Sequence, residues 1–238
     1  MRITIQKEGP YLVSGGVPLL LGEIVTNEDG DSVSFRTIRT IETPETYVLC
    51  RCGHSENKPF CDGAHMKHGF SGATTASHAP HAEQARAIEG EGIVLLDATA
   101  FCMGARFCDR GLGAWKYTET STDETCRTTA IEESCLCPSG RLVMREIDGE
   151  DRVGNEGGVR DNDGVLEYEY EPSIMVLEDP INGMSSALWV RGGIEIVDEH
   201  GQAYEVRNRQ TLCRCGESAN KPFCDGTHYR VRFQDGLT

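Results

Sequence analysis

Two segments of this 238-residue chain carry the same arrangement of cysteine and histidine side chains. The first runs from Cys50 to His65 and the second from Cys213 to His228, and 13 of the 16 positions are identical. Each segment offers three thiols and one imidazole at short spacing, a set of donors suited to binding metal. These donors are Cys50, Cys52, Cys61 and His65 in the first copy and Cys213, Cys215, Cys224 and His228 in the second.

The spacing within each copy predicts how the donors meet. The last cysteine and the histidine are four residues apart, about one helical turn, so both can face one point if a helix begins there. Asp62 and Asp225 are suited to capping that turn. The first two cysteines are two residues apart and can reach one centre from an extended loop. Ser55 and Ser218 are expected to donate further hydrogen bonds that tune the centre.

Composition narrows the classes of function. Eleven cysteines, an odd number, argue against a fully paired disulfide framework and favour metal sites in a reducing compartment. The formal net charge of −15 disfavours a nucleic-acid-binding surface. No apolar stretch approaches the length of a membrane span, and residues 1–7 lack the apolar core of a signal peptide. We therefore expect a cytoplasmic protein that does not bind nucleic acid or membranes.

The repeat extends upstream of the metal donors. Residues 11–17 and 188–194 are each a short β-type run broken by two glycines. Turn-forming residues at 27–31 predict an inserted hairpin in the first copy. We expect an α+β protein, rich in β-structure and poor in helix, with units at residues 1–75, 90–150 and 165–238. The outer two would be small β units that carry the donor loops and pair by pseudo-twofold symmetry, and residues 148–164 would form an exposed loop.

The central unit contains the other five cysteines. Cys102 and Cys108 follow a predicted strand at 93–97, and Cys137 follows a predicted helix at 123–134 and precedes a proline. Three thiolates are enough to hold a 3Fe–4S cluster, whereas an all-cysteine 4Fe–4S cluster needs a fourth ligand, Cys126 or Cys135. The alternative is that these cysteines are simply buried apolar side chains.

Both repeated segments resemble the CDGSH iron–sulfur family, the mitoNEET-like proteins. The family motif is C-x-C-x2-[ST]-x3-P-x-C-D-G-[SAT]-H, and both copies match every position of it. The resemblance implies that each copy holds a 2Fe–2S cluster through its three cysteines and one histidine. In that family two such units form an intertwined pair, which here could be a monomer with internal pairing or a homodimer.

The spacing of Cys102, Cys108 and Cys137-Pro138 resembles single-cluster bacterial ferredoxins and the divergent 4Fe–4S mono-cluster domain. The resemblance implies a ferredoxin-like α+β fold for this unit. The cysteine that usually follows the second one closely is missing, because residues 109–112 read Asp-Arg-Gly-Leu.

These features predict a one-electron carrier whose partners are redox proteins or proteins that accept a cluster. Two alternatives remain open, a 2Fe–2S donor or redox and iron sensor, and a zinc-stabilised interaction protein. No nucleophile–base set is recognisable, so we do not expect an enzyme. The remaining aromatic and imidazole side chains are predicted to be surface residues (His54, His68, His78, His81 and His200) or packing residues (Trp115 and Trp189).

Overall fold

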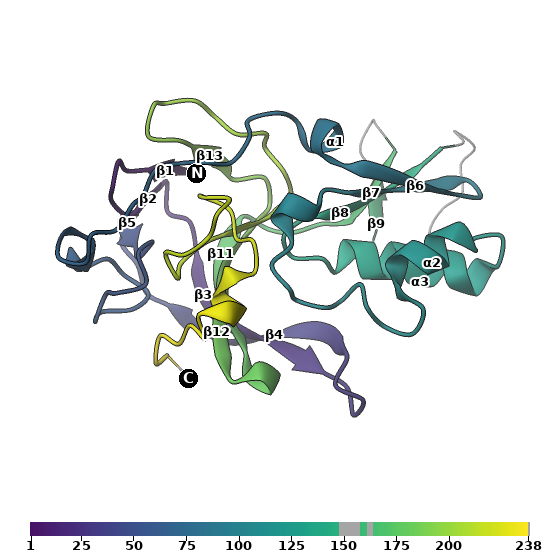
Figure 1. The fold of residues 1–238 in the computed structure, drawn as a ribbon, viewed down its shortest axis with the longest axis horizontal. Helices are drawn as coiled ribbons and strands as arrows, with labels where there is room; N and C mark the ends of the chain where they lie inside the picture. The colour runs from purple at the N-terminus through teal and green to yellow at the C-terminus, as the bar shows by residue number, and fades with distance from the viewer. Residues whose placement is uncertain (148–157, 161–163, 238) are drawn as a thin grey trace.

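The computed structural model of the chain describes residues 1–147, 158–160 and 164–237. Its strands form three sheets and its helices are short. Two sheets and both donor loops lie in one half of the elongated molecule, and the third sheet lies in the other half with its helices (Figure 1). The fold is therefore α+β and rich in β-structure, as the sequence predicts.

The first sheet has the strand order β13-β1-β2-β5. Its members are β1 (Arg2–Ile5), β2 (Tyr11–Ser14), β5 (Thr46–Leu49) and β13 (Glu195–Val197). Polar and apolar residues alternate in β1, so Ile3 and Ile5 are buried while Arg2 is exposed. The last strand, β13, comes from the far end of the chain and pairs in parallel with β1.

The second sheet has the order β14-β12-β11-β3-β4. Its members are β3 (Leu19–Thr26), β4 (Ser32–Ile41), β11 (Ser173–Asp179), β12 (Met184–Arg191) and β14 (Arg209–Leu212). All of β11 is buried, because it lies between β12 and β3 in the sheet. The predicted hairpin of the first copy is confirmed, since β3 and β4 pair in antiparallel fashion around the turn at residues 27–31.

Each outer unit sends part of its chain into the other unit's sheet, the hairpin of β3 and β4 from the first unit and the single strand β13 from the second. In the first unit β3 leaves after Gly15 and Gly16 and pairs in parallel with β11, and in the second β13 leaves after Gly192 and Gly193 and pairs in parallel with β1. All four glycines have positive φ angles, between 66° and 90°, which L-residues with side chains seldom adopt. The paired glycines thus redirect each chain into its partner sheet.

The two outer sheets share one hydrophobic core, so the outer units form a single body. The core cluster joins side chains of the first sheet (Ile3, Val13 and Leu49) to side chains of the second (Leu19, Val176 and Leu188). The internal pairing expected from the repeat is thus present within one chain.

The central unit is a five-stranded sheet of order β6-β7-β8-β10-β9 with two helices packed against it. It comprises β6 (Arg86–Gly90), β7 (Ile93–Asp97), β8 (Leu142–Glu146), β9 (Gly158–Arg160), β10 (Val165–Tyr168), α2 (Gly113–Glu119) and α3 (Glu124–Cys135). The Asp123 carboxylate caps α3 by accepting a hydrogen bond of 3.0 Å from the Cys126 amide. The predicted strand at 93–97 and helix at 123–134 are both confirmed.

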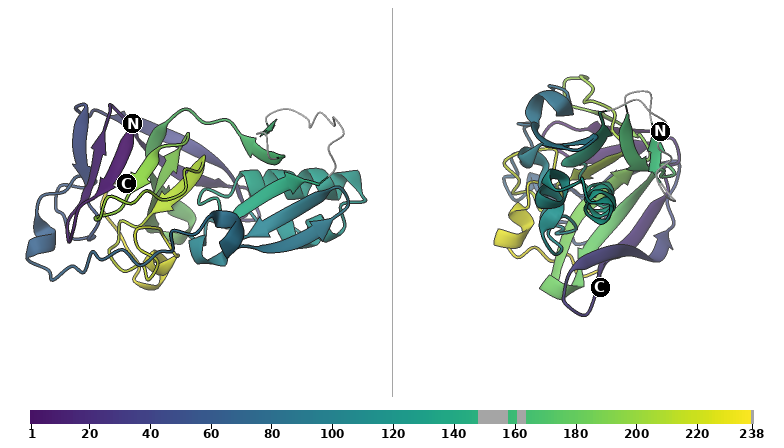
Figure 2. Two further views of the ribbon diagram at one scale, coloured as in Figure 1. Left: turned by 90° about the horizontal axis from the view of Figure 1, so that it is seen from above. Right: turned by 90° about the vertical axis from the view of Figure 1, so that its right-hand side faces the viewer.

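Four short helical segments complete the fold: η1 (Ala64–Met66), α1 (His81–Gln84), η2 (Thr99–Phe101) and α4 (Thr227–Arg230), with a further turn η3 (Pro180–Asn182) after β11. Both η1 and α4 carry the histidine of a donor segment. From above, the central unit extends from one end of the outer body (Figure 2).

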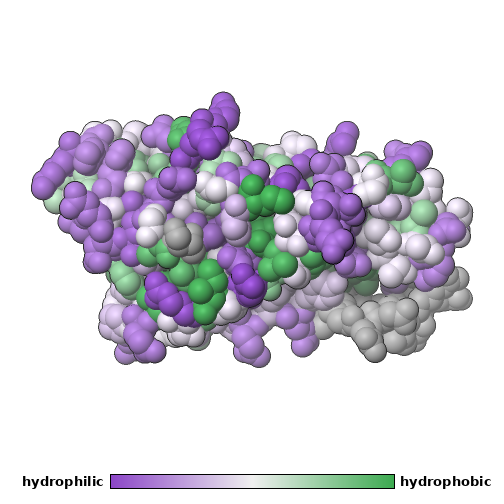
Figure 3. All heavy atoms as spheres, turned by 90° about the horizontal axis from the view of Figure 1, so that it is seen from below, coloured by the Kyte–Doolittle hydropathy of each residue, from purple (hydrophilic) through white to green (hydrophobic). Residues whose placement is uncertain are grey.

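A second hydrophobic cluster joins the central unit to the outer body. Met103 and Phe107 of the central loop pack with Trp189 of β12 and Leu177 of β11. The packing role predicted for Trp189 is therefore confirmed. The face seen from below is mostly polar, with separate apolar patches (Figure 3).

Three details differ from the sequence predictions. The central sheet continues to Tyr168, beyond the expected boundary at 150, because β10 pairs with β8. Most of the predicted loop at 148–164 lies outside the described residues, although residues 158–160 form β9. His81 is buried rather than exposed, and its Nε2 lies 3.0 Å from the Arg141 carbonyl oxygen.

In the part of the chain that the structure describes, no helix is long and apolar enough to cross a membrane.

Candidate metal centres

The N-terminal donors fall into two pairs. Cys50 and Cys52 follow the end of β5, and their Sγ atoms lie 3.8 Å apart. Cys61 and His65 lie on either side of the turn into η1, with Cys61 Sγ 3.5 Å from His65 Nδ1. The sequence prediction that each pair can face one point is met by this geometry.

The C-terminal donors repeat the arrangement. Cys213 and Cys215 follow β14 with their Sγ atoms 3.7 Å apart. Cys224 Sγ lies 3.3 Å from Nδ1 of His228, which is in α4.

These distances between donor atoms match those between two ligands of one tetrahedral metal. With metal–sulfur bonds of about 2.3 Å and metal–nitrogen bonds of about 2.0–2.1 Å, two sulfurs on one tetrahedral metal lie about 3.8 Å apart, and sulfur and nitrogen about 3.6 Å apart. Within the described ranges, no three His, Cys, Asp or Glu side chains gather closely enough to hold a single metal ion. Each site therefore offers its four donors as two pairs, each at about the spacing of two ligands on one tetrahedral metal.

The aspartates of the two motifs cap the ligand turns, as expected. Asp62 Oδ1 accepts a 3.0 Å hydrogen bond from the Ala64 amide, and Asp225 Oδ1 accepts one of 3.0 Å from the Thr227 amide. Their second oxygens accept from the Glu56 and Ala219 amides across the loop, both at 2.8 Å. One carboxylate thus fixes both ends of each donor loop.

The motif serines donate to the first cysteine of each site through their backbone amides, Ser55 to Cys50 and Ser218 to Cys213, whereas their hydroxyls bond elsewhere. The Ser55 hydroxyl donates to the Phe60 carbonyl oxygen at 2.6 Å, and the Ser218 hydroxyl donates to the Phe223 carbonyl oxygen at 2.7 Å. A hydroxyl has one proton to donate, so these side chains close the loop rather than bond to sulfur. The backbone N–H groups instead face the thiols, such as that of Gly63, which lies 3.4 Å from Cys61 Sγ.

The first cysteine of each motif is prepared to act as a thiolate. A hydrogen bond from Cys52 lowers the pKa of Cys50 to about 6 against the opposing effect of burial, and the Ser55 and Gly53 amides lower it further. In the second copy a hydrogen bond from Cys215 lowers the pKa of Cys213 to about 7. The effect is confined to the first cysteine, because donating that hydrogen bond raises the pKa of Cys52 and of Cys215, and burial raises the pKa of Cys61 and of Cys224.

His228 is held as a neutral ligand. Burial, and then the charge of Arg214, lowers the pKa of His228 to about 4. Its Nε2 lies 3.3 Å from Ser186 Oγ. If Nδ1 binds metal, Nε2 carries the proton and can donate it to this hydroxyl, which fixes the ring.

An arginine between the first two cysteines anchors each donor loop, a role that sequence reasoning missed. Arg51 Nε donates to the Gly9 carbonyl oxygen at 2.8 Å. Arg214 Nε donates to the Ser186 carbonyl oxygen at 2.7 Å, and its other nitrogens pair with Glu178 and Asp235. The signal was available, because both copies read Cys-Arg-Cys.

The two donor loops meet at the pseudo-twofold axis. Cys52 and Cys215 form an antiparallel β-bridge. A Cβ atom on Gly53 would lie 2.5 Å from the Cys215 carbonyl oxygen, and one on Gly216 would lie 2.5 Å from the Cys52 carbonyl oxygen. Glycine at both positions is therefore required for the loops to approach so closely.

Three of the central cysteines converge, as their spacing predicts. Cys102, Cys108 and Cys137 line one cavity of about 30 Å³. Burial, and then the charges of Cys137 and Cys102, raises the pKa of Cys108 to about 12. The donor set fits a cluster held by three cysteines.

The two cysteines considered as a fourth ligand do not reach the cavity. Cys126 lies near the start of α3, about 13 Å along the helix axis from Cys135. Cys135 is fully buried, and its thiol donates to the Leu166 carbonyl oxygen of β10 at 3.2 Å. Neither lines the cavity, so the structure brings together three thiols.

Two arginines organise the central site and were also missed. Arg141 Nη1 lies 3.1 Å from Cys102 Sγ, while its other nitrogens donate to Asp97 at 2.6 and 3.0 Å. Arg209 is fully buried and donates to the carbonyl oxygens of Cys135 and Cys137 at 2.9 and 2.6 Å. Arg209 belongs to β14, so no signal local to the central cysteines could have revealed it.

Comparison with known families agrees with this geometry. The family described as iron-binding zinc finger CDGSH type matches residues 8–66 and 186–229, which contain all eight outer donors. The family described as divergent 4Fe-4S mono-cluster matches residues 88–147, which contain the central cysteines. The chain thus contains two regions that match the CDGSH family and one that matches the divergent 4Fe-4S family, which together support an iron–sulfur protein. Searches of curated proteins and of solved structures found no match.

The two CDGSH sites differ in their surroundings. Cys61 and His65 are half-buried, and Met66, which follows the ligand, is 79% exposed. Cys224 and His228 are buried, at 3% and 1% exposure.

Proposed function

We propose that this protein is a one-electron carrier with a 2Fe–2S cluster in each CDGSH site. The observation that carries the proposal is the pairing of donors in each site at the edge lengths of two metal tetrahedra, with backbone amides facing the sulfurs. A bound 2Fe–2S cluster supplies one-electron chemistry, taking one electron from a donor protein and passing one to an acceptor.

The protein's own residues bind and insulate this chemistry. Three thiols and one imidazole in each site supply the ligands, and the Asp62 and Asp225 caps hold the histidine turns in place. The arginine anchors fix the loops to the sheets, so little reorganisation accompanies a change of charge. Tight positioning of this kind suits electron transfer, and nothing in the proposal requires a catalytic base or nucleophile.

The central site is included in the proposal as a three-thiol site. Cys102, Cys108 and Cys137 can bind a 3Fe–4S cluster, or three irons of a 4Fe–4S cluster whose fourth iron lacks a cysteine. Arg141 would offset the negative charge there, because its guanidinium already contacts the Cys102 sulfur.

Anaerobic purification with iron and acid-labile sulfide counts tests the proposal. About four irons with matching sulfide indicate the two CDGSH clusters alone, and about seven or eight indicate that the central thiols also bind one. A colourless protein with stoichiometric zinc and no sulfide would refute the proposal and favour a zinc-stabilised interaction protein.

A second candidate, delivery of 2Fe–2S clusters to acceptor proteins, is favoured by one observation. The N-terminal ligands Cys61 and His65 are only half-buried, so an acceptor's thiols could approach them. Incubation with an apo-ferredoxin separates the two functions. Transfer that is faster from the oxidised protein favours delivery, whereas a retained cluster with rapid reversible electron exchange favours a carrier.

A further inference from the structure

The C-terminal CDGSH loop is covered by two other segments of the chain. The first is the linker after the N-terminal unit, where the Thr75 and Ala76 amides donate to the Lys221 carbonyl oxygen at 2.8 and 2.9 Å. The Thr75 hydroxyl also donates to the Ala219 carbonyl oxygen at 2.8 Å. The linker therefore runs along the outer edge of this donor loop.

The second covering segment is the loop of the central unit that begins at η2. Asn220 Nδ2 donates to the Ala100 carbonyl oxygen at 2.9 Å. Phe101 packs edge-on against Phe223, the residue before Cys224, with ring centroids 5.1 Å apart. A Cβ atom on Gly226 would lie 3.2 Å from the Cys102 carbonyl oxygen.

Tyr229 closes this wall beside the histidine ligand. Its hydroxyl lies 3.0 Å from the Gly104 carbonyl oxygen and 2.6 Å from Asp179 Oδ2. A Cβ atom on Gly104 would lie 2.5 Å from the Tyr229 ring, so only glycine allows this contact. The ring also lies against His228, with centroids 4.3 Å apart.

The N-terminal donor loop has less cover among the described residues. The hydrogen bonds that Glu56, Asn57 and Lys58 donate stay within their own loop, and the contact with another segment is that of the Lys58 ammonium, 5.9 Å from the Phe233 ring of the C-terminal tail. A Cβ atom on Gly63, the counterpart of Gly226, would meet only the Met66 side chain within 4 Å. Met66 occupies the position of Tyr229 and is exposed.

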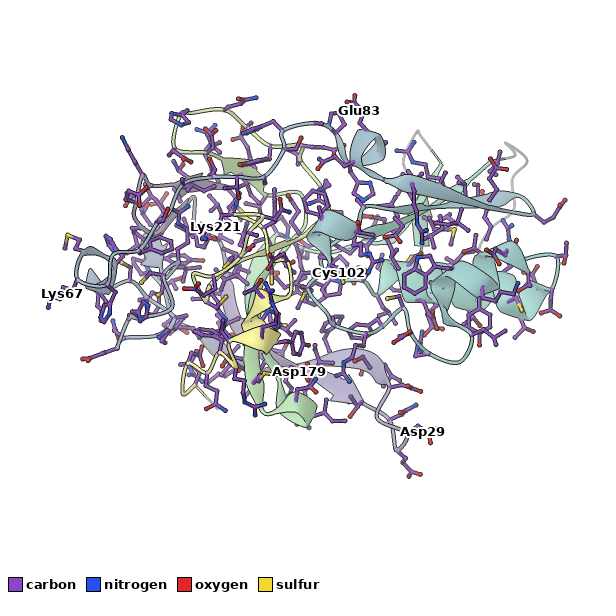
Figure 4. The ribbon with its side chains drawn as sticks, in the orientation of Figure 1. Asp29, Lys67, Glu83, Cys102, Asp179 and Lys221 are labelled. Atoms are coloured by element: carbon purple, nitrogen blue, oxygen red, sulfur yellow. The ribbon has the colours of Figure 1, made fainter. Side chains whose placement is uncertain are left out.

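The sites are also ordered along the molecule. Lys67, two residues after the N-terminal histidine, lies at one extreme edge, and Cys102 lies where the central unit meets the outer body (Figure 4). The C-terminal loop and α4 lie between them (Figure 1). The β-bridge between Cys52 and Cys215 joins the first two sites, and the Gly104–Tyr229 contact joins the second to the central loop.

We propose that the two CDGSH sites have different roles, and that the N-terminal site is the one that partner proteins reach. The C-terminal site is an internal site, walled by residues 75–76 and 100–104 and by Tyr229, and placed between the N-terminal site and the central thiols. The inference rests on the proposed function for its electron-transfer role, but its geometric content requires only that both CDGSH sites hold metal.

Metal release under a chelator tests the proposal at neutral pH. The protein is reduced anaerobically with dithionite and mixed with bathophenanthroline disulfonate, and loss of the 2Fe–2S absorbance is followed with time. We expect two phases of equal amplitude whose rates differ about tenfold or more, since release from the walled site needs a local opening that breaks hydrogen bonds and packing. Cys61→Ser, which removes an N-terminal donor, should abolish the fast phase.

Matched variants locate the wall. Tyr229→Ala should bring the slow phase close to the fast one, whereas Met66→Ala, at the equivalent position, should leave both phases unchanged. Tyr229→Phe keeps the ring and should retain the slow phase, and hydrogen exchange of residues 100–104 should rise in Tyr229→Ala but not in Met66→Ala.

A single phase in the wild type, loss of the slow phase in Cys61→Ser, or an unchanged slow phase in Tyr229→Ala would each overturn the proposal. Sulfide and iron counts on the untreated protein test the proposed function separately, because they show whether the sites hold iron–sulfur clusters whatever the release rates are. If the sites hold zinc, the same order of release is read with a zinc-sensitive chelator, and equal rates overturn the inference.

Discussion

The contact between the two donor loops gives the sharpest prediction. Gly53 and Gly216 face each other's loops across the pseudo-twofold axis, with φ angles of 81° and 86°. Gly53→Ala places a Cβ atom 2.5 Å from the Cys215 carbonyl oxygen, so the two backbones must separate. We expect this variant to be destabilised and to lose iron from both CDGSH sites.

The magnitude follows from two contributions. An alanine in the left-handed region costs about 1–2 kcal/mol whatever its surroundings. Forcing the loops apart adds an overpacking cost of about 1–3 kcal/mol. The expected loss in the free energy of unfolding is therefore about 2–5 kcal/mol.

Gly201→Ala is the matched control. Its φ angle is 87°, and a Cβ atom there has nothing within 4 Å. It should lose only the conformational contribution of about 1–2 kcal/mol and keep its iron. Anaerobic urea unfolding followed by circular dichroism gives both free energies, and metal analysis gives the iron content. Equal penalties for Gly53→Ala and Gly201→Ala would show that the close approach of the donor loops is not what constrains Gly53.

Three further predictions concern the buried charges. Arg214→Met removes the arginine that pairs with Glu178 and Asp235, so it should lower the free energy of unfolding in urea by about 3–5 kcal/mol. Arg51→Met should lower it by only about 1–3 kcal/mol, because the described hydrogen bonds of Arg51 go to backbone carbonyl oxygens. Equal losses in the two variants would contradict this prediction. Arg209→Met removes the donor to the Cys135 and Cys137 carbonyl oxygens, so if the central thiols bind iron as proposed, that iron should be lost while the CDGSH absorbance persists. Loss of iron from the CDGSH sites first would contradict this expectation. Burial would raise the pKa of Asp97, but hydrogen bonds from Arg141 and Trp115 lower that pKa overall. The ionised Asp97 carboxylate therefore stabilises the folded protein fully above the unfolded pKa near 3.8. This contribution disappears as the pH falls through the lower pKa of the folded state. Asp97→Asn should therefore destabilise the iron-stripped protein by about 2–4 kcal/mol at pH 7 and progressively less below pH 4, and a gap that widens in acid would refute this assignment.

Local features of the fold could be predicted from the sequence because they depend on nearby residues. The α3 cap at Asp123, the strand at 93–97 and the hairpin turn at 27–31 all have short-range signals, and the structure contains each of them. The strand exchange has no such signal. A β-type run after two glycines shows that the chain turns, but its sheet partner is decided by which apolar faces can be buried together.

The donors themselves were predictable, and most of their supporting groups were not. Spacing alone placed Cys61 with His65 and Cys224 with His228. Arg209 of the central site comes from β14, about 70 positions from Cys137 in the chain, so only the fold brings these two residues together. The position of Cys126 could have been anticipated, because a residue at the start of a predicted helix cannot meet a residue beyond the end of that helix.

The order of units along the chain accounts for the inequivalence of two nearly identical motifs. The chain must travel from the first donor loop to the central unit and then return to build the second. The linker at residues 75–76 and the central loop at residues 100–104 both pass over the second loop on this path, and no described segment passes over the first in the same way. Two of the three differences within the motif, Glu56/Ala219 and Ala64/Thr227, exchange small or polar residues on the loop. The residue just after each motif also differs, because Tyr229 contacts Gly104 of the central loop whereas Met66 is exposed. A repeat with identical ligands thus acquires one open and one enclosed site.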